Sequence, residues 1–163
     1  MEWDEIYSSH SDLIYRLCKR MVGENDAEDL FQEIFLDIYN SLDSFRGEAA
    51  VSTWIYRIAV NHCAKHTRRK KLISFIPLVN DIMEESDSPS AELEKSETEN
   101  MLNTAINQLP GRQKTAVVLY YFHQMKHKEI AEILSISPKA VESTMARAKQ
   151  TMARILTKTT RIY

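Results

Sequence analysis

The chain has 163 residues, which suffices for one domain or two small ones, and 44% of them are hydrophobic, so ordinary cores can form. With only 3 glycines and 4 prolines it has few of the turn residues that an all-β fold requires, and its longest apolar run, residues 116–122, is far too short to span a membrane. The polar, acidic start does not resemble a secretory signal, and the 2 cysteines form no spaced framework. These features predict a cytoplasmic protein with ordinary thiols and no membrane insertion of its own.

The net charge of −2 conceals four blocks of alternating sign. Residues 1–44 carry a net charge of −8 and residues 45–71 a net charge of +6, whereas residues 72–100 carry −7 and residues 101–163 carry +7. Two basic blocks, each beside an acidic one, indicate two surfaces for nucleic acid. Because a charge block alone is usually a solvated face, sequence motifs are needed to decide whether these surfaces bind nucleic acid.

Two helices are expected in the first 44 residues. The first covers about residues 3–22, with apolar side chains at helical spacing, and ends at Gly23, a residue that favours helix C-termini. The second begins after Asn25 or Asp26, either of which can cap it. It has an apolar stripe on one side and an acidic face on the other.

A third helix follows a loop that contains Phe45 and Arg46. Ser52 or Thr53 caps this helix, which runs to about residue 70. From there to residue 90, prolines and acidic and serine-rich sequence break the helical pattern and predict a flexible linker.

Four helices are expected beyond the linker, at about residues 91–108, 112–122, 128–134 and 138–156. Ser137 is a good N-cap for the last of them, and the proline after it suits a first helical turn. Strand-like alternation of any length is absent from the sequence, so the predicted fold is all-α, with two small helical domains.

A short helix, a three-residue turn and a longer basic helix form the pattern of a helix-turn-helix. The side chains predicted to face inward are Ile130, Ala131, Leu134, Val141, Met145, Ala148 and Met152. At the start of the second helix and on its outward face lie Ser137, Lys139, Glu142, Ser143 and Arg147. Because such side chains suit base edges and phosphates in a major groove, we expect DNA binding here.

The third helix carries a second basic surface. Its polar side and end hold Arg57, Asn61, His62, Lys65, Arg68 and Arg69. Basic groups beside an aromatic loop suit capture of a single strand, although Trp54 lies on the apolar stripe and is expected to be core. The acidic face of the second helix has the wrong sign for DNA and fits a basic protein partner or solvent.

Three segments resemble sigma factors of the extracytoplasmic-function (ECF) type. They are AEDLFQEIFLDIY at 27–39, FRGEAAVSTWIYRIAVN at 45–61 and LPGRQKTAVVLYYFHQMKHKEIAEILSISPKAVESTMARAKQ at 109–150. Their order, spacing and total length agree with that family. The resemblance covers regions two and four, which is nearly the whole chain apart from the linker and the last few residues.

The resemblance implies an alternative sigma factor with region two at residues 1–71, a linker at 72–90 and region four at 91–163. Asp29, Gln32 and Glu33 would bind the clamp helices of the largest polymerase subunit. The other partners implied are the polymerase flap, promoter DNA and an anti-sigma factor. No catalytic residue, metal or cofactor is implied.

Within the family, the loop like that of Phe45 and Arg46 forms a pocket for a flipped base of the −10 element. The helix that carries Arg57 and Asn61 holds the neighbouring strand. The second helix of the helix-turn-helix reads the −35 element as duplex DNA.

The sequence departs from the family at four positions. Lys65 stands where an aspartate is usual, and Ser135 replaces the glycine of the turn, so a non-glycine residue must adopt or change the turn geometry. Glu142 and Thr144 occupy positions that are often basic, which is expected to weaken phosphate anchoring there and to alter the −35 preference.

Two alternatives compete with the sigma-factor interpretation. A helix-turn-helix regulator that acts without polymerase would use residues 101–163 but would give the acidic helix and the second basic surface no role. A metal-dependent enzyme or sensor could use His62, Cys63 and His66, which lie within about one helical turn, but no further ligand or catalytic pair is evident.

Overall fold

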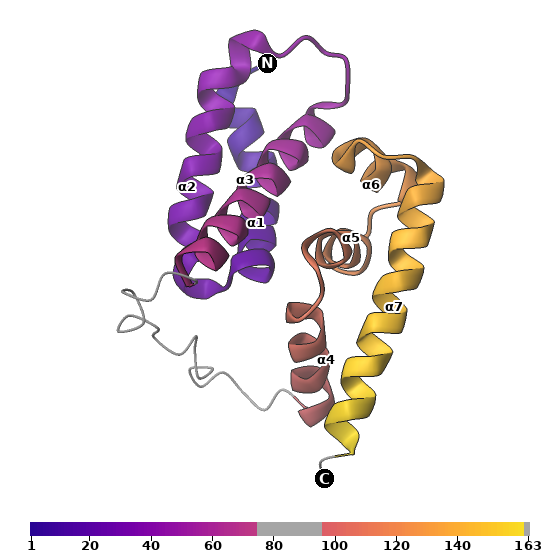
Figure 1. The fold of residues 1–163 in the computed structure, drawn as a ribbon. Helices are drawn as coiled ribbons and strands as arrows, with labels where there is room; N and C mark the ends of the chain where they lie inside the picture. Colours follow the sequence, from indigo (N-terminus) through magenta and orange to yellow (C-terminus); the bar gives the residue numbers. More distant parts are fainter. Residues whose placement is uncertain (75–95, 162–163) are drawn as a thin grey trace.

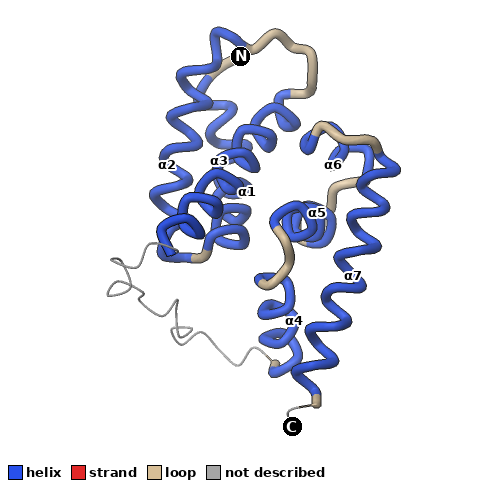
Figure 2. The backbone as a smooth tube through the Cα atoms, in the orientation of Figure 1, coloured by secondary structure: helices blue, strands red, loops and turns tan. Residues whose placement is uncertain are grey.

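The computed structural model describes residues 1–74 and 96–161. These residues form seven α-helices and one short 3-10 helix, with no strand among them (Figures 1 and 2). The predicted all-α class is confirmed, and the helices divide into two groups along the chain.

Residues 1–74 form a bundle of three helices around one core. Helix α1 spans Trp3–Val22, α2 spans Glu24–Ser41 and α3 spans Val51–Ser74, and a 3-10 helix, η1, covers Leu42–Ser44. Each α-helix has apolar residues every third or fourth position, and these faces meet. Fully buried side chains of this core include Ile14, Leu17, Ile34, Ile38 and Ile55.

A single residue, Gly23, separates α1 from α2. Its φ of +88° favours glycine, and its N–H donates to the carbonyl of Lys19, so it ends α1 as predicted. Gly23 is also the N-cap of α2, which begins at Glu24, so the prediction that Asn25 or Asp26 caps this helix is wrong. The glycine turns the chain within one residue, which leaves Asn25 and Asp26 inside the first helical turn.

Helix α3 is longer at both ends than predicted. It starts at Val51, so Ser52 and Thr53 lie within the first turn rather than at the cap, and Thr53 is buried in the core. Residues 72–74, a leucine, an isoleucine and a serine that were expected in the linker, continue the helix because leucine favours helix and no proline or glycine interrupts them. The rest of the predicted linker, residues 75–90, lies outside the described residues.

Residues 96–161 form the second group of helices. Helix α4 spans Glu97–Asn107, α5 spans Gly111–Tyr121, α6 spans His127–Leu134 and α7 spans Pro138–Thr160. The predicted start of the first of these helices, near residue 91, lies outside the described residues. Fully buried side chains of this group include Val118, Leu119, Ile130 and Val141.

The predicted helix-turn-helix is formed by α6 and α7. Ser135 ends α6 with a φ of +54°, so a non-glycine residue adopts the left-handed conformation of the turn. The Ser137 hydroxyl accepts a backbone N–H of α7 at 3.1 Å, and Pro138 stands in the first turn, both as predicted. Leu134 is partly buried and packs against the core as predicted, and Ile133, which was not predicted, is buried on the inward side of α6 as well.

The two groups of helices are docked on one another. Helix α3 contacts α6, and α1 contacts α5 (Figure 1). Helix α2 lies on the side of its bundle away from α4–α7, so its outer face is not covered by the second group of helices.

Candidate nucleic-acid interface

The outer face of α2 combines polar and apolar side chains. Asp29, Gln32 and Glu33 are exposed, and their spacing places them on one face of the helix. Leu36 is 63% exposed on the same face, and Tyr39, one turn further along, is 56% exposed. These two residues were not predicted, although the position of Leu36 outside the buried stripe is a signal that could have identified it.

The inner face of α2 is held on α1 by aromatic rings. Phe35 is buried, with its ring 5.1 Å from that of Tyr7 and 6.0 Å from that of Trp3, both near edge-to-face. Trp3 also meets Tyr39, at 5.1 Å. These contacts fix the orientation of α2, so its polar face points away from the bundle.

A basic stripe runs along α3. Arg57, Asn61, Lys65 and Arg68 are separated by four, four and three residues and therefore share one face of the helix. Asn61, Lys65, Arg68 and Arg69 are exposed. The fold thus places four of the eight residues predicted for the −10 element on one accessible face of α3.

Two of the predicted −10 residues are engaged within the protein. Arg57 donates from Nη2 to the carbonyl of Glu132 in α6 at 2.7 Å. Nε2 of His62 lies 2.8 Å from a carboxylate oxygen of Asp37 in α2. Because these partners stand 75 and 25 positions away in the chain, local sequence patterns could not predict them.

The loop between η1 and α3 carries Phe45 and Arg46. The Phe45 ring packs on that of Trp54 with 4.8 Å between centroids, whereas Arg46 is exposed. Trp54 is partly buried against the core, as expected. Gly47 has a φ of +71°, a conformation that lets the loop turn back toward α3.

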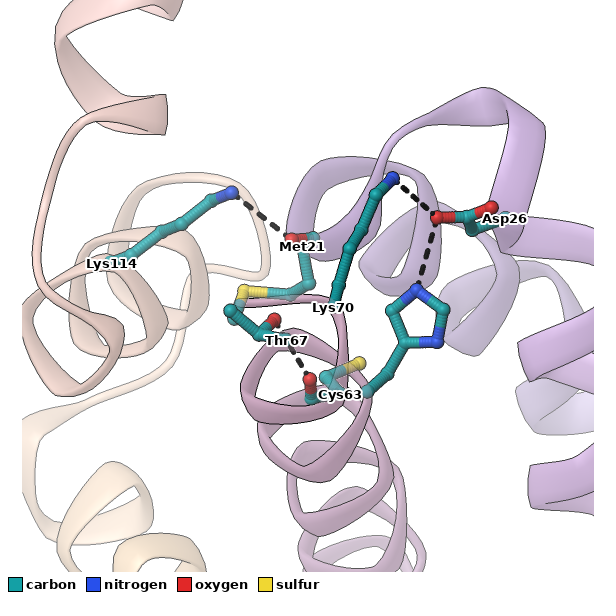
Figure 3. Close-up of polar contacts among 7 residues, drawn as sticks. Met21, Asp26, Cys63, Thr67, Lys70 and Lys114 are labelled. Carbon is teal, nitrogen blue, oxygen red and sulfur yellow. Dashed lines mark hydrogen bonds and ion pairs between the residues drawn. The ribbon is translucent and has the colours of Figure 1, made fainter. Parts of the chain in front are cut away.

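Asp26 ties the first turn of α2 to the end of α3 (Figure 3). One of its carboxylate oxygens accepts from Nζ of Lys70 at 2.9 Å and lies 3.0 Å from Nε2 of His66. The hydrogen bond from Lys70 lowers the pKa of Asp26, an effect that partial burial opposes and the His66 contact reinforces. The carboxylate therefore stays charged and joins two helices.

The metal-ligand candidates do not converge. His62 and His66 each face a different carboxylate, Asp37 and Asp26 respectively. Cys63 is buried, and its hydrogen bond with Cys18, together with burial, raises the pKa of its thiol. Within residues 1–74 and 96–161 no group of three or more histidine, cysteine or carboxylate side chains could hold a metal ion.

The outward face of α7 is accessible as predicted, with Lys139, Glu142, Ser143 and Arg147 all exposed. The hydroxyl of Ser137, also predicted for the −35 element, is occupied as the cap of the helix.

Thr144 does not belong to the outward face of α7. It is 6% exposed, and its hydroxyl donates to the carbonyl of Ala140 at 2.8 Å. The expectation that Thr144 weakens phosphate anchoring is therefore wrong, because this side chain faces the interior and is almost entirely buried. Glu142 remains the departure from the basic pattern that lies on the accessible face.

A basic stripe on a three-helix bundle, together with a second accessible surface on a helix-turn-helix, is typical of two-domain DNA-binding proteins. Residues 6–73 match the family model of sigma-70 region 2, and residues 99–152 match that of sigma-70 region 4. The chain belongs to the ECF RNA polymerase sigma factors, an alternative sigma-factor family that directs transcription initiation.

Curated relatives extend over nearly the whole chain. The ECF RNA polymerase sigma factor SigW of Bacillus subtilis is 31% identical, over 93% of this chain and 87% of its own length. The ECF RNA polymerase sigma-E factor of Haemophilus influenzae is 32% identical, over 89% of this chain and 82% of its own length. Both matches span the two groups of helices.

Solved structures share the fold. The sigma factor RpoE from Bartonella quintana, in complex with the anti-sigma factor NepR, has a TM-score of 0.74 at 17% identity, over 94% of this chain and 96% of that one. CnrH, in complex with the cytosolic domain of CnrY, has a TM-score of 0.67 at 19% identity, over 96% and 88%. In this chain, no helix of residues 1–74 and 96–161 has the length and apolar character of a membrane span.

Proposed function

We propose that the chain binds core RNA polymerase through α2, holds the melted −10 strand on α3 and reads the −35 duplex with α7. In this proposal residues 1–71 act as region two, 72–90 as the linker and 91–163 as region four. The protein acts in the cytoplasm and performs no catalysis of its own. The observation that carries the proposal is the separation of an exposed acidic face on α2 from a basic stripe on α3 within one small bundle.

The polymerase-binding role rests on the outer face of α2. Asp29 and Glu33 supply negative charge, Gln32 supplies amide hydrogen-bonding groups and Leu36 adds an exposed apolar side chain at the same face. Such a surface complements a basic, partly apolar helical partner, which the clamp helices of the largest polymerase subunit would provide. The docked arrangement of the two groups of helices leaves this face accessible.

The test is a double change, Gln32→Lys with Glu33→Lys. It reverses the charge of the face, so we expect it to abolish co-purification with core polymerase and promoter-specific transcription. The matched control is Glu24→Lys with Asp43→Lys, two exposed acidic positions near the ends of α2, which should leave both intact. If the first pair of changes also left both intact, the role of this face would be refuted.

The −10 role rests on the exposed residues of α3. Asn61 offers an amide for base or sugar contacts, and Lys65, Arg68 and Arg69 follow it along the helix with positive charge for phosphates. The nearby aromatic loop, where the Phe45 ring packs at a tilt against that of Trp54, supplies an apolar surface against which a flipped base can lie.

The −35 role rests on α7. Lys139, Ser143 and Arg147 face solvent along one side of the helix, with a basic and hydroxyl character that suits phosphates and base edges in a major groove. Glu142 lies among them and favours cytosine, because its carboxylate can accept a hydrogen bond that the cytosine amino group donates, over bases that present acceptors at that point.

An anti-sigma factor is part of the proposal. The neighbours RpoE and CnrH were solved with an anti-sigma factor and with the cytosolic domain of CnrY, respectively. We infer that this chain too is restrained by an inhibitory protein. Co-purification of that protein from the native cells, with recovery of transcription when it is removed, tests the inference, and transcription unchanged by its removal would contradict it.

A further inference from the structure

The accessible side of α7 continues beyond the helix-turn-helix. Exposed polar residues on this side are spaced by four, four, three, four, four and three positions, so they form one stripe along the helix and its C-cap. They are Lys139, Ser143, Arg147, Gln150, Arg154, Lys158 and Arg161. The proposed reading of the −35 element uses only the first three of them, which leaves the far end of the stripe without a role.

Three cations, Arg154, Lys158 and Arg161, form this far end, and we call them the distal cluster. All three are exposed, and none of the ion pairs within residues 1–74 and 96–161 includes any of them. Positions 143–163 hold five basic residues and no acidic one. The distal cluster is therefore positive charge that no ion pair of the described chain neutralises.

Helix stability accounts for only part of this charge. A cation is favoured near the C-terminus of a helix, where the helix dipole is negative. Lys158 lies in the last turn of α7 and Arg161 is its C-cap, so both stabilise the helix end. Arg154 lies before the last turn, where the effect of the dipole has fallen off. Its presence on the stripe points to a function outside the helix itself.

Helix α4 holds the distal part of α7 in place (Figure 1). Met152, Ile155 and Leu156 are partly buried, and their spacing places them on the side of α7 away from the stripe. The apolar side of the helix is thus fixed against the rest of its group. As a result, the distal cluster points to solvent from a supported helix and keeps its alignment with Arg147.

The chemistry of the distal cluster suits phosphate. A surface hollow of about 330 Å³ lies there, lined by Ala153, Arg154, Thr157, Lys158 and Arg161. Ala153 and Thr157 are small, so they leave room for a phosphate among the three cations, and guanidinium and ammonium groups form strong charge-assisted hydrogen bonds with phosphate oxygens. The described residues that line the hollow include no large apolar side chain, whereas protein interfaces usually have an apolar or aromatic core. A phosphate backbone is therefore favoured over a protein partner.

We propose that the distal cluster binds backbone phosphates of the DNA that flanks the −35 element. The proposal rests on the reading of that element by the first part of α7. Helix α7 is about 34 Å long at about 1.5 Å per residue, whereas the major groove is only about 12 Å wide, so the helix reaches past the groove that it enters. Arg161 lies about 21 Å beyond Arg147, a distance that corresponds to about 6 base pairs of duplex.

The distal cluster has a different task from the first part of α7. Phosphates are the same in every sequence, so contacts with them add affinity and fix the position of the helix without selecting bases. They also partly offset the unfavourable charge of Glu142, which lies on the accessible face near the −35 bases. One straight helix then joins a sequence-reading segment to a sequence-independent anchor.

The test measures binding of the full chain to duplex DNA at several salt concentrations, by fluorescence anisotropy. The duplex carries the −35 element of a promoter identified from induced transcripts, with about ten base pairs on each side. Arg154→Gln removes one cation of the cluster, and Arg154→Gln with Lys158→Gln removes two. The matched control, Arg112→Gln, removes an exposed arginine at the start of α5. Circular dichroism should show the same helix content in all of them, because glutamine is a good helix former.

Each phosphate contact that is lost should lower the slope of log affinity against log salt by about 0.9. Between about 50 and about 200 mM salt, the affinity of the double variant should therefore fall about twelvefold less than that of the wild type, and that of Arg154→Gln about threefold to fourfold less. Arg112→Gln should behave as the wild type. Equal slopes for the wild type and the double variant would overturn the proposal.

Duplexes of different length locate the contact. On a short duplex that ends about two base pairs beyond the −35 element, the wild type and the double variant should have the same slope, because the flanking phosphates are absent. Extension of the duplex on one side only should restore the difference for one of the two sides, which identifies the flank. An equal difference on the short duplex, or no recovery on either side, would contradict a contact outside the element.

A duplex with a scrambled −35 sequence separates this proposal from the previous one. The difference in slope between the wild type and the double variant should persist on it, because phosphate contacts weaken binding uniformly across sequences when they are lost. If it persists while the wild type does not distinguish the two sequences, the distal contact stands and the reading of the −35 element by α7 is refuted. A double variant that binds DNA as the wild type does, but loses transcription with polymerase, would assign the cluster to an acidic protein partner and overturn the proposal.

Discussion

Tyr56 and His123 stand 67 positions apart and meet through a hydrogen bond of 2.8 Å between the tyrosine hydroxyl and Nδ1 of the imidazole. Burial raises the pKa of Tyr56 to about 12, so the hydroxyl keeps its proton and can donate it to the ring nitrogen. The contact therefore uses neutral His123. It also joins the two groups of helices at a place where α3 carries the basic stripe.

Acidification should open the chain through His123. Burial, and then the positive charges of Arg16 and Arg20 on α1, lower the pKa of His123 to about 4. The other group that faces it is Tyr56, on α3. Because the docked state resists protonation of His123, its stability is complete above the ordinary histidine pKa of about 6.5 and is lost as the pH falls from there toward about 4.

From pH 7.5 to pH 5.5, the ratio of closed to open chains should fall by at most about tenfold, since His123 is partly exposed and solvent screens part of the effect. X-ray scattering across this range measures the change. His123→Ala should remove the pH dependence, and His127→Ala should retain it. The same pH dependence in His123→Ala would show that another group is responsible.

Asp26→Asn should destabilise the N-terminal bundle by about 1 kcal/mol, because it removes the ion pair with Lys70 and the contact with His66 at a partly exposed site. In the folded protein the pKa of Asp26 lies below its ordinary value of about 3.8. The contribution of Asp26 to the free energy of unfolding is therefore complete above about pH 3.8 and is lost as the pH falls through the lowered pKa. Urea unfolding at neutral pH measures the effect.

The control for Asp26 is Asp12→Asn. Asp12 pairs with Arg16 four residues along α1 at 3.2 Å, and both side chains are largely exposed. That change should cost only about 0.3–0.5 kcal/mol. Equal effects of the two substitutions would mean that the tie between α2 and α3 adds nothing beyond a surface ion pair.

Asn61→Ala should impair strand opening more than initial promoter binding. Asn61 is exposed on the stripe of α3 that we assign to the single strand, and this strand becomes available only once the duplex melts. Gel shift measures closed-complex formation and permanganate reactivity measures melting, on a promoter identified from transcripts induced by overexpression. Equal losses in both assays would count against a strand-capture role.

The two faces of α7 should respond oppositely to mutation. Arg147→Ala, on the exposed face, should leave the fold intact and weaken −35 duplex binding by about 1–3 kcal/mol if the side chain contacts a base, or reduce the salt dependence if it contacts a phosphate. Unchanged affinity and salt dependence would refute its placement in the interface.

Thr144→Arg should destabilise the second group of helices by about 3 kcal/mol or more, because it places a charge at a position that is 6% exposed. The adjacent Ser143→Arg, on the exposed face, should change stability by less than about 0.5 kcal/mol. Thermal unfolding distinguishes them. A stable Thr144→Arg variant with higher DNA affinity would mean that position 144 faces DNA.

Several features follow from the sequence alone because they depend on neighbours along the chain. Apolar spacing predicts that Ile34 and Ile38 share the buried side of one helix, and both are fully buried. Ser137 before Pro138 predicts a capped helix, and the cap is present. The family's segments also lie in order along the chain, and the family models match them.

What only the tertiary structure decided is which side chains meet across distant segments. The sequence predicts that Arg57 and His62 bind DNA. In the structure Arg57 donates to the carbonyl of Glu132, and His62 faces the carboxylate of Asp37. Thr144 stands at a position that is often basic in the family, yet it is buried. Helical period and capping are local properties, whereas these partners depend on how the helices dock. The alternating charge of the sequence therefore indicates two DNA surfaces but not the contacts between the two groups of helices.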